Sequence, residues 1–231
     1  MGHELILHEK RFEICEELRA LPVQTGDIFF RLGNETFAGL PFSRLVAKVT
    51  KSDFAHAAVA FFRPIDPFPR LVEVNAGGVQ EVRLTDWLDY CWSPRIAIYR
   101  PVESVFDSEV ERQKWQERLL RIINFFLDED PDYDFSFDPD RSKFYCTEAV
   151  EFLYNESNFP NRDLCVLYRP KDLMSWFDYN ILFKPGNWFM RKLFKRGMSL
   201  DLDTVFVGNR ERGLMSSPYL HEVLNKDFLV K

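Results

Sequence analysis

Three residues of this sequence have side chains and local settings suited to nucleophilic catalysis, and the first is a histidine. His56 lies in the apolar run 55–62, a predicted strand in which alternate residues share one face. Its companions on that face are Ala58, Ala60 and Phe62. Small neighbours leave a crevice beside an imidazole, so we interpret His56 as a candidate general base. The alternative is a core histidine whose hydrogen bonds are satisfied internally.

The second candidate is a carboxylate in the next predicted strand. Glu73 and Asn75 share one face of the run 71–75, and a carboxylate in an apolar run needs a partner or water. If the two strands form a hairpin, either side chain can reach His56, and strand parity cannot choose between them. A carboxylate stabilises an imidazolium, whereas an amide only orients the ring, so Glu73 is favoured. The alternative is an edge strand whose outer face is solvated.

The third candidate is Cys146, which lies where an acidic loop ends and a predicted helix begins. The helix dipole and the free N–H groups of a first turn favour a thiolate and can help to form an oxyanion hole. Cys15, Cys91 and Cys165 lack this placement and are interpreted as structural. The alternative for Cys146 is a buried structural thiol.

Composition and motifs exclude several other classes of protein. The net charge of −6 argues against a nucleic-acid binder. Phosphate-binding loops and Cys-x-x-Cys pairs are absent, and an EF-hand counted from Asp130 fails because Phe135 and Arg141 occupy the positions of its glycine and glutamate. We therefore expect no metal and no organic cofactor. Without a secretory signal or an apolar span, a cytoplasmic protein with reduced thiols is expected.

The elements that must position these residues follow from periodicity. Short apolar runs bounded by turn residues predict strands near 28–30, 55–62, 71–76, 79–83 and 96–99. Helical spacing predicts helices after Pro41, over 107–128 and over 146–154, with a further helix opened by Pro170. With neither a repeat nor a linker, residues 1–231 are expected to form a single α+β domain, with a small antiparallel sheet packed against helices.

The order of several short motifs adds a family resemblance. These are Gly26-Asp27-Ile28, Phe54-Ala55-His56, Val72-Glu73, Gly77-Gly78-Val79, Tyr99-Arg100-Pro101, Tyr133-Asp134-Phe135 and Tyr145-Cys146-Thr147-Glu148-Ala149-Val150. Together they resemble the circularly permuted branch of the NlpC-type papain-like thiol hydrolases, the YiiX-like group, in which the histidine strand precedes the nucleophile. The resemblance covers residues 24–180 and departs from the usual pattern at Thr147, where serine is more common.

The resemblance implies a papain-like fold in which Cys146 is the nucleophile, His56 the general base and Glu73 its orienting partner. Tyr145 would lie at the site and could bind the oxyanion. Members of this superfamily cleave amide bonds in cell-wall peptides, or transfer and hydrolyse acyl groups on lipids. The resemblance therefore implies a cysteine-dependent hydrolase or acyltransferase that cleaves an amide or ester bond of an N-acylated, lipid-like or peptide substrate through an acyl-enzyme.

Two alternatives come from other classes of function. One is a catalytically silent binding module that keeps the papain-like cleft. The other is a lipid- or membrane-surface protein: residues 181–231 form a C-terminal extension of unknown role, and within it 183–196 is basic and, if helical, amphipathic. Packing of that face on the core, with the lysines reaching solvent, is the favoured explanation. The sequence leaves open the substrate, hydrolysis against transfer, and the oligomeric state.

Overall fold

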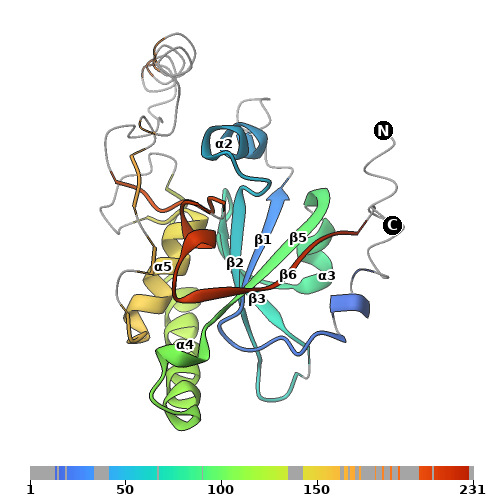
Figure 1. Cartoon of the computed structure of the whole chain (residues 1–231), viewed down its shortest axis with the longest axis vertical. Helices are drawn as coiled ribbons and strands as arrows, with labels where there is room; N and C mark the ends of the chain where they lie inside the picture. Colours follow the sequence, from blue (N-terminus) through green and yellow to red (C-terminus); the bar gives the residue numbers. More distant parts are fainter. Residues whose placement is uncertain are drawn as a thin grey trace.

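The computed structural model describes most of the chain (Figure 1). The described ranges are 14–33, 42–134, 143–169 and 203–228, and five single positions are described besides them: 172, 180, 184, 188 and 192. Within the ranges, residues 15, 19, 67, 90, 162, 163, 166 and 210 are not described. The helix predicted at Pro170, residues 135–140 of the acidic loop and nearly all of 183–196 lie outside them. No helix among the described residues is long and apolar enough to cross a membrane.

A six-stranded antiparallel sheet is the centre of an α+β fold, and its strand order is β4-β3-β2-β1-β5-β6. The strands are β1 (Ile28–Gly33), β2 (His56–Phe61), β3 (Arg70–Asn75), β4 (Gly78–Arg83), β5 (Cys91–Pro101) and β6 (Leu220–Asp227). The first five match the apolar runs of the sequence. The sixth was not expected, because it lies in the polar tail, and it pairs antiparallel with β5. Part of the C-terminal extension is thus an edge strand of this sheet.

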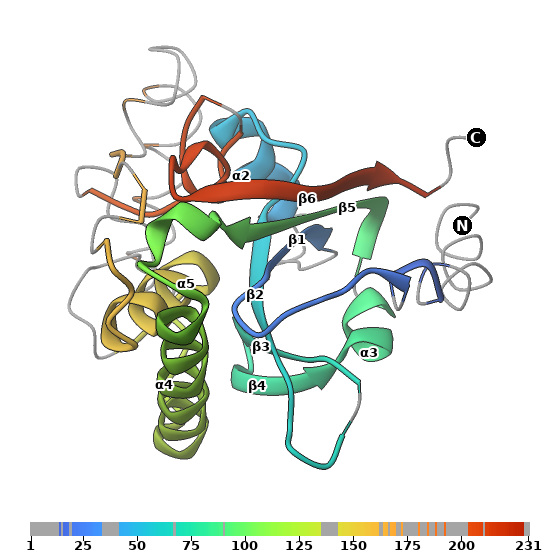
Figure 2. The ribbon, with the colours of Figure 1, turned by 60° about the horizontal axis from the view of Figure 1, so that its bottom comes forward.

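Helices cover both faces of the sheet (Figure 2). They are α2 (Phe42–Thr50), α3 (Leu84–Asp89), α4 (Glu109–Glu129) and α5 (Cys146–Glu156), with short 3₁₀ turns η1 (Glu103–Val105) and η3 (Leu214–Ser216). α4 begins after Ser108, whose hydroxyl accepts a hydrogen bond from the N–H of Glu111 and so caps the helix. The predicted helices at 107–128 and 146–154 are confirmed within two residues at each end.

Alternation along β2 divides the core into two clusters. Ala57, Val59 and Phe61 contribute to the larger cluster, which includes the buried faces of α4 and α5. Ala58 and Ala60 contribute to the smaller cluster on the other face, where α3 packs. The period of two in a strand is sufficient to produce this division.

Residues of the first and fifth motifs join β1 to β5. The guanidinium of Arg100 donates two hydrogen bonds of 2.7 Å to the buried carboxylate of Asp27, one to each oxygen. Gly26 adopts φ +95°, and a Cβ at this position would lie 2.4 Å from the ring of Trp115. The hydroxyl of Tyr154, on α5, donates to the carbonyl of Gly26. These motif residues therefore hold the sheet against α4 and α5.

Candidate active site

His56 and Glu73 form a buried pair on one face of neighbouring strands. The register of β2 and β3 pairs Val59 with Val72, which by extension sets Asn75 opposite His56. Glu73 lies one pair further along the same face, and its Oε2 is 2.6 Å from Nε2 of His56. The side chain of His56 is 6% exposed, and that of Glu73 is 1% exposed. The hairpin that the sequence favoured is thus present, and it brings the two candidates together.

Asn75 holds the other oxygen of the same carboxylate. Its Nδ2 donates to Oε1 of Glu73 over 3.0 Å and to Oε1 of Gln80, on β4, over 3.2 Å. The carboxylate of Glu73 is thereby fixed between an amide on one side and an imidazole on the other. In this geometry Asn75 orients Glu73, and Glu73 orients His56.

The charges of this pair support each other. Burial by itself would lower the pKa of His56, but the negative charge of Glu73 and the adjoining Cys146 outweigh burial and raise that pKa to about 10. Burial would likewise raise the pKa of Glu73, yet its interactions with His56 and Arg31 lower it to about 2. Between about pH 2 and about pH 10, His56 is therefore an imidazolium and Glu73 a carboxylate.

Cys146 is the first residue of α5, and α5 packs against β2 and β3. Its thiol lies 3.9 Å from the carbonyl oxygen of Ala55, the residue before His56. Cys146 also lies close enough to the ring of His56 to raise the pKa of that imidazole. Because Nε2 of that ring is bound to Glu73, Nδ1 is the atom that remains for the thiol. The structure therefore brings Cys146, His56 and Glu73 into one cluster.

The residues on either side of Cys146 both bind the backbone of Val205. The N–H of Val205 donates to the hydroxyl oxygen of Tyr145 over 3.1 Å, and the hydroxyl of Thr147 donates to the carbonyl of Val205 over 2.7 Å. Burial raises the pKa of Tyr145 well above its usual value, so the phenol is neutral. Tyr145 thus anchors the start of α5. The oxyanion role of its hydroxyl stays a prediction, and the N–H groups of the first turn, which have no intrahelical acceptor, are further candidate donors.

Arg31 belongs to the cluster and was missed by the sequence reasoning. It pairs with His56 in the register of β1 and β2, and its side chain is 1% exposed. Its Nη2 lies 3.5 Å from Oε2 of Glu73. The available signal was an arginine within the apolar run 28–32, on the same strand face as Phe29.

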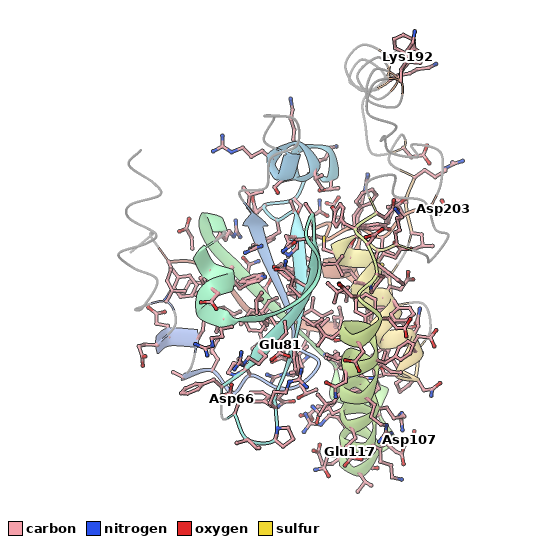
Figure 3. The ribbon with its side chains drawn as sticks, turned by 180° about the vertical axis from the view of Figure 1, so that it is seen from behind. Asp66, Glu81, Asp107, Glu117, Lys192 and Asp203 are labelled. Atoms are coloured by element: carbon pink, nitrogen blue, oxygen red, sulfur yellow. The ribbon has the colours of Figure 1, made fainter. Side chains whose placement is uncertain are left out.

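Unlike the buried Glu73, acidic residues such as Asp107 and Glu117 lie on the outer surface (Figure 3).

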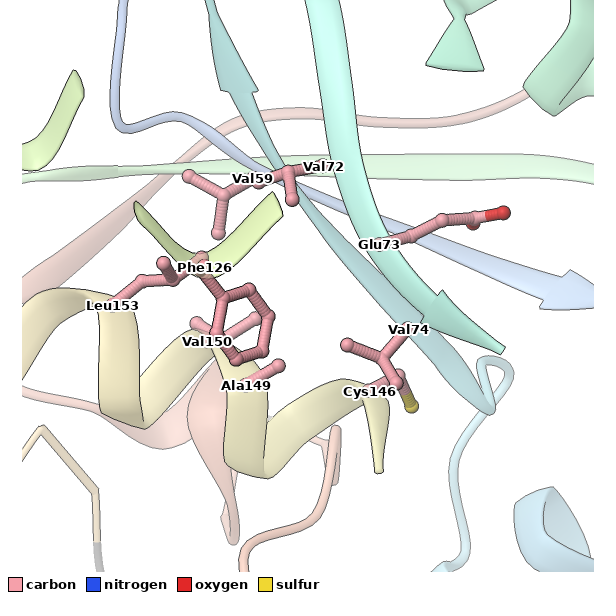
Figure 4. A pocket seen from close by; sticks show the side chains of 9 residues that line it. All are labelled: Val59, Val72, Glu73, Val74, Phe126, Cys146, Ala149, Val150 and Leu153. Atoms are coloured by element: carbon pink, nitrogen blue, oxygen red, sulfur yellow. The ribbon is translucent and has the colours of Figure 1, made fainter. Parts of the chain in front are cut away.

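A narrow crevice with no room for a water molecule separates α5 from the sheet beside this cluster. It is lined by Val59, Val72, Glu73, Val74, Phe126, Cys146, Ala149, Val150 and Leu153. The sulfur of Cys146 and the carboxylate of Glu73 point away from the apolar side chains (Figure 4). The crevice is therefore a packing gap behind the sulfur and the carboxylate.

The other buried thiol differs from Cys146 in its surroundings. Burial and the charge of Glu151 raise the pKa of Cys165 to about 12, so this cysteine stays a thiol at neutral pH. Both cysteines are free. Within the described ranges, no group of three or more His, Cys, Asp and Glu side chains could hold a metal ion.

No known protein family, curated protein or solved structure matches the chain. The geometry of the cluster is therefore the ground on which a function can be assigned.

Proposed function

We propose that this chain is a cysteine-dependent hydrolase or acyltransferase that cleaves an amide or ester bond through an acyl-enzyme on Cys146. One observation carries the proposal: a buried imidazole, held by a carboxylate at 2.6 Å, adjoins a thiol at the start of a helix. A nucleophile, a base and a group that orients the base are the parts that such a reaction requires. The chain order, with the His56 strand before Cys146, agrees with a permuted papain-like fold.

In the proposed mechanism Nδ1 of His56 holds the proton of the Cys146 thiol before the substrate binds, because the raised pKa of His56 keeps its imidazole protonated at neutral pH. The sulfur then attacks the substrate carbonyl carbon, and the resulting oxyanion is bound by N–H groups of the first turn of α5. His56 returns its proton to the leaving amine or alcohol as the bond to it breaks. Water or an acceptor attacks the thioester in the second half of the reaction and restores the thiol.

Glu73 would fix the tautomer of His56 and stabilise its imidazolium form. The substrate classes follow from the family resemblance, and they are small N-acylated, lipid-like or peptide compounds. Because the reaction needs a reduced thiol, we place the protein in a reducing compartment such as the cytoplasm.

Thiol reactivity tests the proposal directly. Native protein is treated with iodoacetamide at pH 6, and alkylation of each cysteine-containing peptide is timed by mass spectrometry, with urea-unfolded protein as the reference. We expect Cys146 to react faster in the native state than in the unfolded state, and Cys165, the internal control, to react more slowly. His56→Gln should remove the acceleration at Cys146. If native Cys146 reacts no faster than unfolded Cys146, the catalytically silent binding module is the better assignment.

The substrate class requires a second experiment. Activated acyl esters, N-acyl amino acids and short peptides are offered to the wild type and to Cys146→Ala, and only turnover lost in the variant counts. Adding an amine or alcohol acceptor separates transfer from hydrolysis. A membrane-surface contact through 183–196 is a separate proposal, tested by sedimentation with anionic vesicles at low and high salt.

A further inference from the structure

Arg31 and His56 share one carboxylate oxygen. Nη2 of Arg31 is 3.5 Å from Oε2 of Glu73, the atom that lies 2.6 Å from Nε2 of His56. The guanidinium is held in place on its other side, because Nη1 donates to the carbonyl of Trp87 and the group lies 4.7 Å from the centre of the Trp87 ring. A buried arginine is thus fixed beside the proposed catalytic pair.

Glu73 and His56 lie in a cluster whose polar and charged groups come from five elements. They are Arg31 on β1, His56 on β2, Asn75 on β3, Gln80 on β4 and Cys146 on α5. Arg31 carries a permanent positive charge, His56 carries a positive charge when it is protonated, and Glu73 carries the negative charge. Without Arg31, His56 would carry the only positive charge among these groups, and Glu73 would hold the imidazole proton in a tight ion pair.

With Arg31 present, the negative charge of Glu73 is already balanced. The proton between His56 and Cys146 can then occupy either residue without leaving Glu73 as an uncompensated buried charge, which would be costly. Burial acts first on the pKa of His56 and lowers it, Glu73 raises it, and the charge of Arg31 lowers it again. Arg31 therefore opposes the effect of Glu73 on the imidazole.

We propose that Arg31 is a positioning residue of the active site: it shares Glu73 with His56 and keeps the imidazole proton transferable to the leaving group. This inference rests on the proposed function. Arg31 acts through Glu73 and does not itself contact the reacting atoms. A merely structural Arg31 would instead anchor α3 through Trp87 and affect only the stability of the fold.

The test uses Arg31→Met, which removes the charge at similar length, and Arg31→Lys, which keeps the charge. Removing a positive charge makes every nearby group hold its proton more tightly. The pH profile of Cys146 alkylation by iodoacetamide should therefore move upward by about one pH unit in Arg31→Met. The titration of His56, followed by NMR of its imidazole, should move in the same direction. Arg31→Lys should restore most of both shifts.

Arg100→Met is the matched control, because Arg100 is likewise an arginine bound to a buried carboxylate, that of Asp27. It should reduce stability and leave the alkylation profile of Cys146 unchanged. If Arg31→Met does not fold, Glu73→Gln is compared with Glu73→Gln/Arg31→Met, in which both buried charges are absent. Only the direct effect of the Arg31 charge on His56 remains in that background, so the second substitution should shift the profile by well under one pH unit.

The outcomes separate this inference from the proposed function. If wild-type Cys146 shows no accelerated alkylation, the proposed function itself is wrong. If wild-type Cys146 is accelerated but folded Arg31→Met keeps its pH profile, the function stands and the role of Arg31 is overturned. A full additional shift from Arg31→Met in the Glu73→Gln background would also overturn it.

Discussion

Asn75 donates a hydrogen bond of 3.0 Å to Oε1 of Glu73, whose Oε2 binds the ring of His56. Both residues share one strand face, and the extended register places Asn75, not Glu73, opposite the histidine. The longer side chain of Glu73 reaches diagonally to the ring, while the amide of Asn75 supports the carboxylate. Asn75 therefore positions the carboxylate of Glu73, and Glu73 in turn positions the ring of His56.

This arrangement predicts unequal effects of substitution at the two positions. Glu73→Gln keeps the shape but removes the charge that stabilises the imidazolium, so turnover should fall by about 10²–10⁴-fold. Asn75→Ala leaves Glu73 on His56 and should cost less. The comparison is made on kcat with any substrate from the screen, and circular dichroism checks that both variants fold. If Asn75→Ala were the more damaging substitution in folded protein, the order His56–Glu73–Asn75 would be wrong.

The pair also predicts how stability depends on pH. Burial lowers the pKa of folded His56, but Glu73 and Cys146 raise it from 6.5 to about 10. The stabilisation is therefore complete below about pH 6.5 and is lost as the pH rises through about 10. The pKa of Glu73 is lowered from 4.5 to about 2, so on the acid side the stabilisation is lost as the pH falls from about 4.5 through 2.

Urea unfolding of the wild type and Glu73→Gln at pH 6 to 10 measures this effect. The advantage of the wild type should shrink with rising pH, by at most about 1.4 kcal/mol per pH unit for one proton. Groups that titrate in both proteins cancel in the difference. Two parallel stability curves over this range would contradict the buried ion pair.

A third prediction concerns the attachment of α5 to Val205. Thr147→Val removes the donor to the carbonyl of buried Val205 and should lower the free energy of unfolding by about 1–3 kcal/mol. Thr147→Ser keeps the hydroxyl and should behave like the wild type. Chemical denaturation measures both, and a loss in Thr147→Ser as large as that in Thr147→Val would contradict the stabilising role of the hydrogen bond.

Tyr145→Phe separates the structural role of Tyr145 from the proposed oxyanion role. If the hydroxyl serves Val205 alone, the variant should lose stability and keep most of its turnover. If the hydroxyl binds the oxyanion, kcat should fall by about 10²-fold or more. The loss of stability and the loss of turnover are both measured on Tyr145→Phe. Thr147→Val is the comparison for a purely structural change.

Gly26 predicts a large loss of stability on a small substitution. Gly26→Ala places a Cβ at φ +95° and 2.4 Å from Trp115, and should cost about 2–5 kcal/mol. Gly77→Ala is the control, because its Cβ would meet only the ends of the Gln80 and Asn75 side chains, at 2.9 and 3.2 Å. Thermal unfolding of both variants measures the difference, and similar melting temperatures would contradict the packing at Gly26.

The sequence by itself determined the local features of this protein. Apolar runs of strand length located β1 to β5, and helical spacing located α4 and α5, because burial of one face imposes a period of two or 3.6 on the chain. The same period placed His56 and Glu73 on inward faces. The position of Cys146 at the start of α5 followed from the end of the acidic loop.

The tertiary structure decided every relationship that depends on distance across the fold. β6 lacked an apolar signal because it is a partly solvated edge strand, and its pairing with β5 defines it. The choice of Glu73 over Asn75 depended on a diagonal contact that strand parity cannot encode. Arg31 and Val205 entered the site because packing of β1 and of the C-terminal segment brings them there, and no local periodicity records which distant group will compensate a buried charge or bind a free hydroxyl.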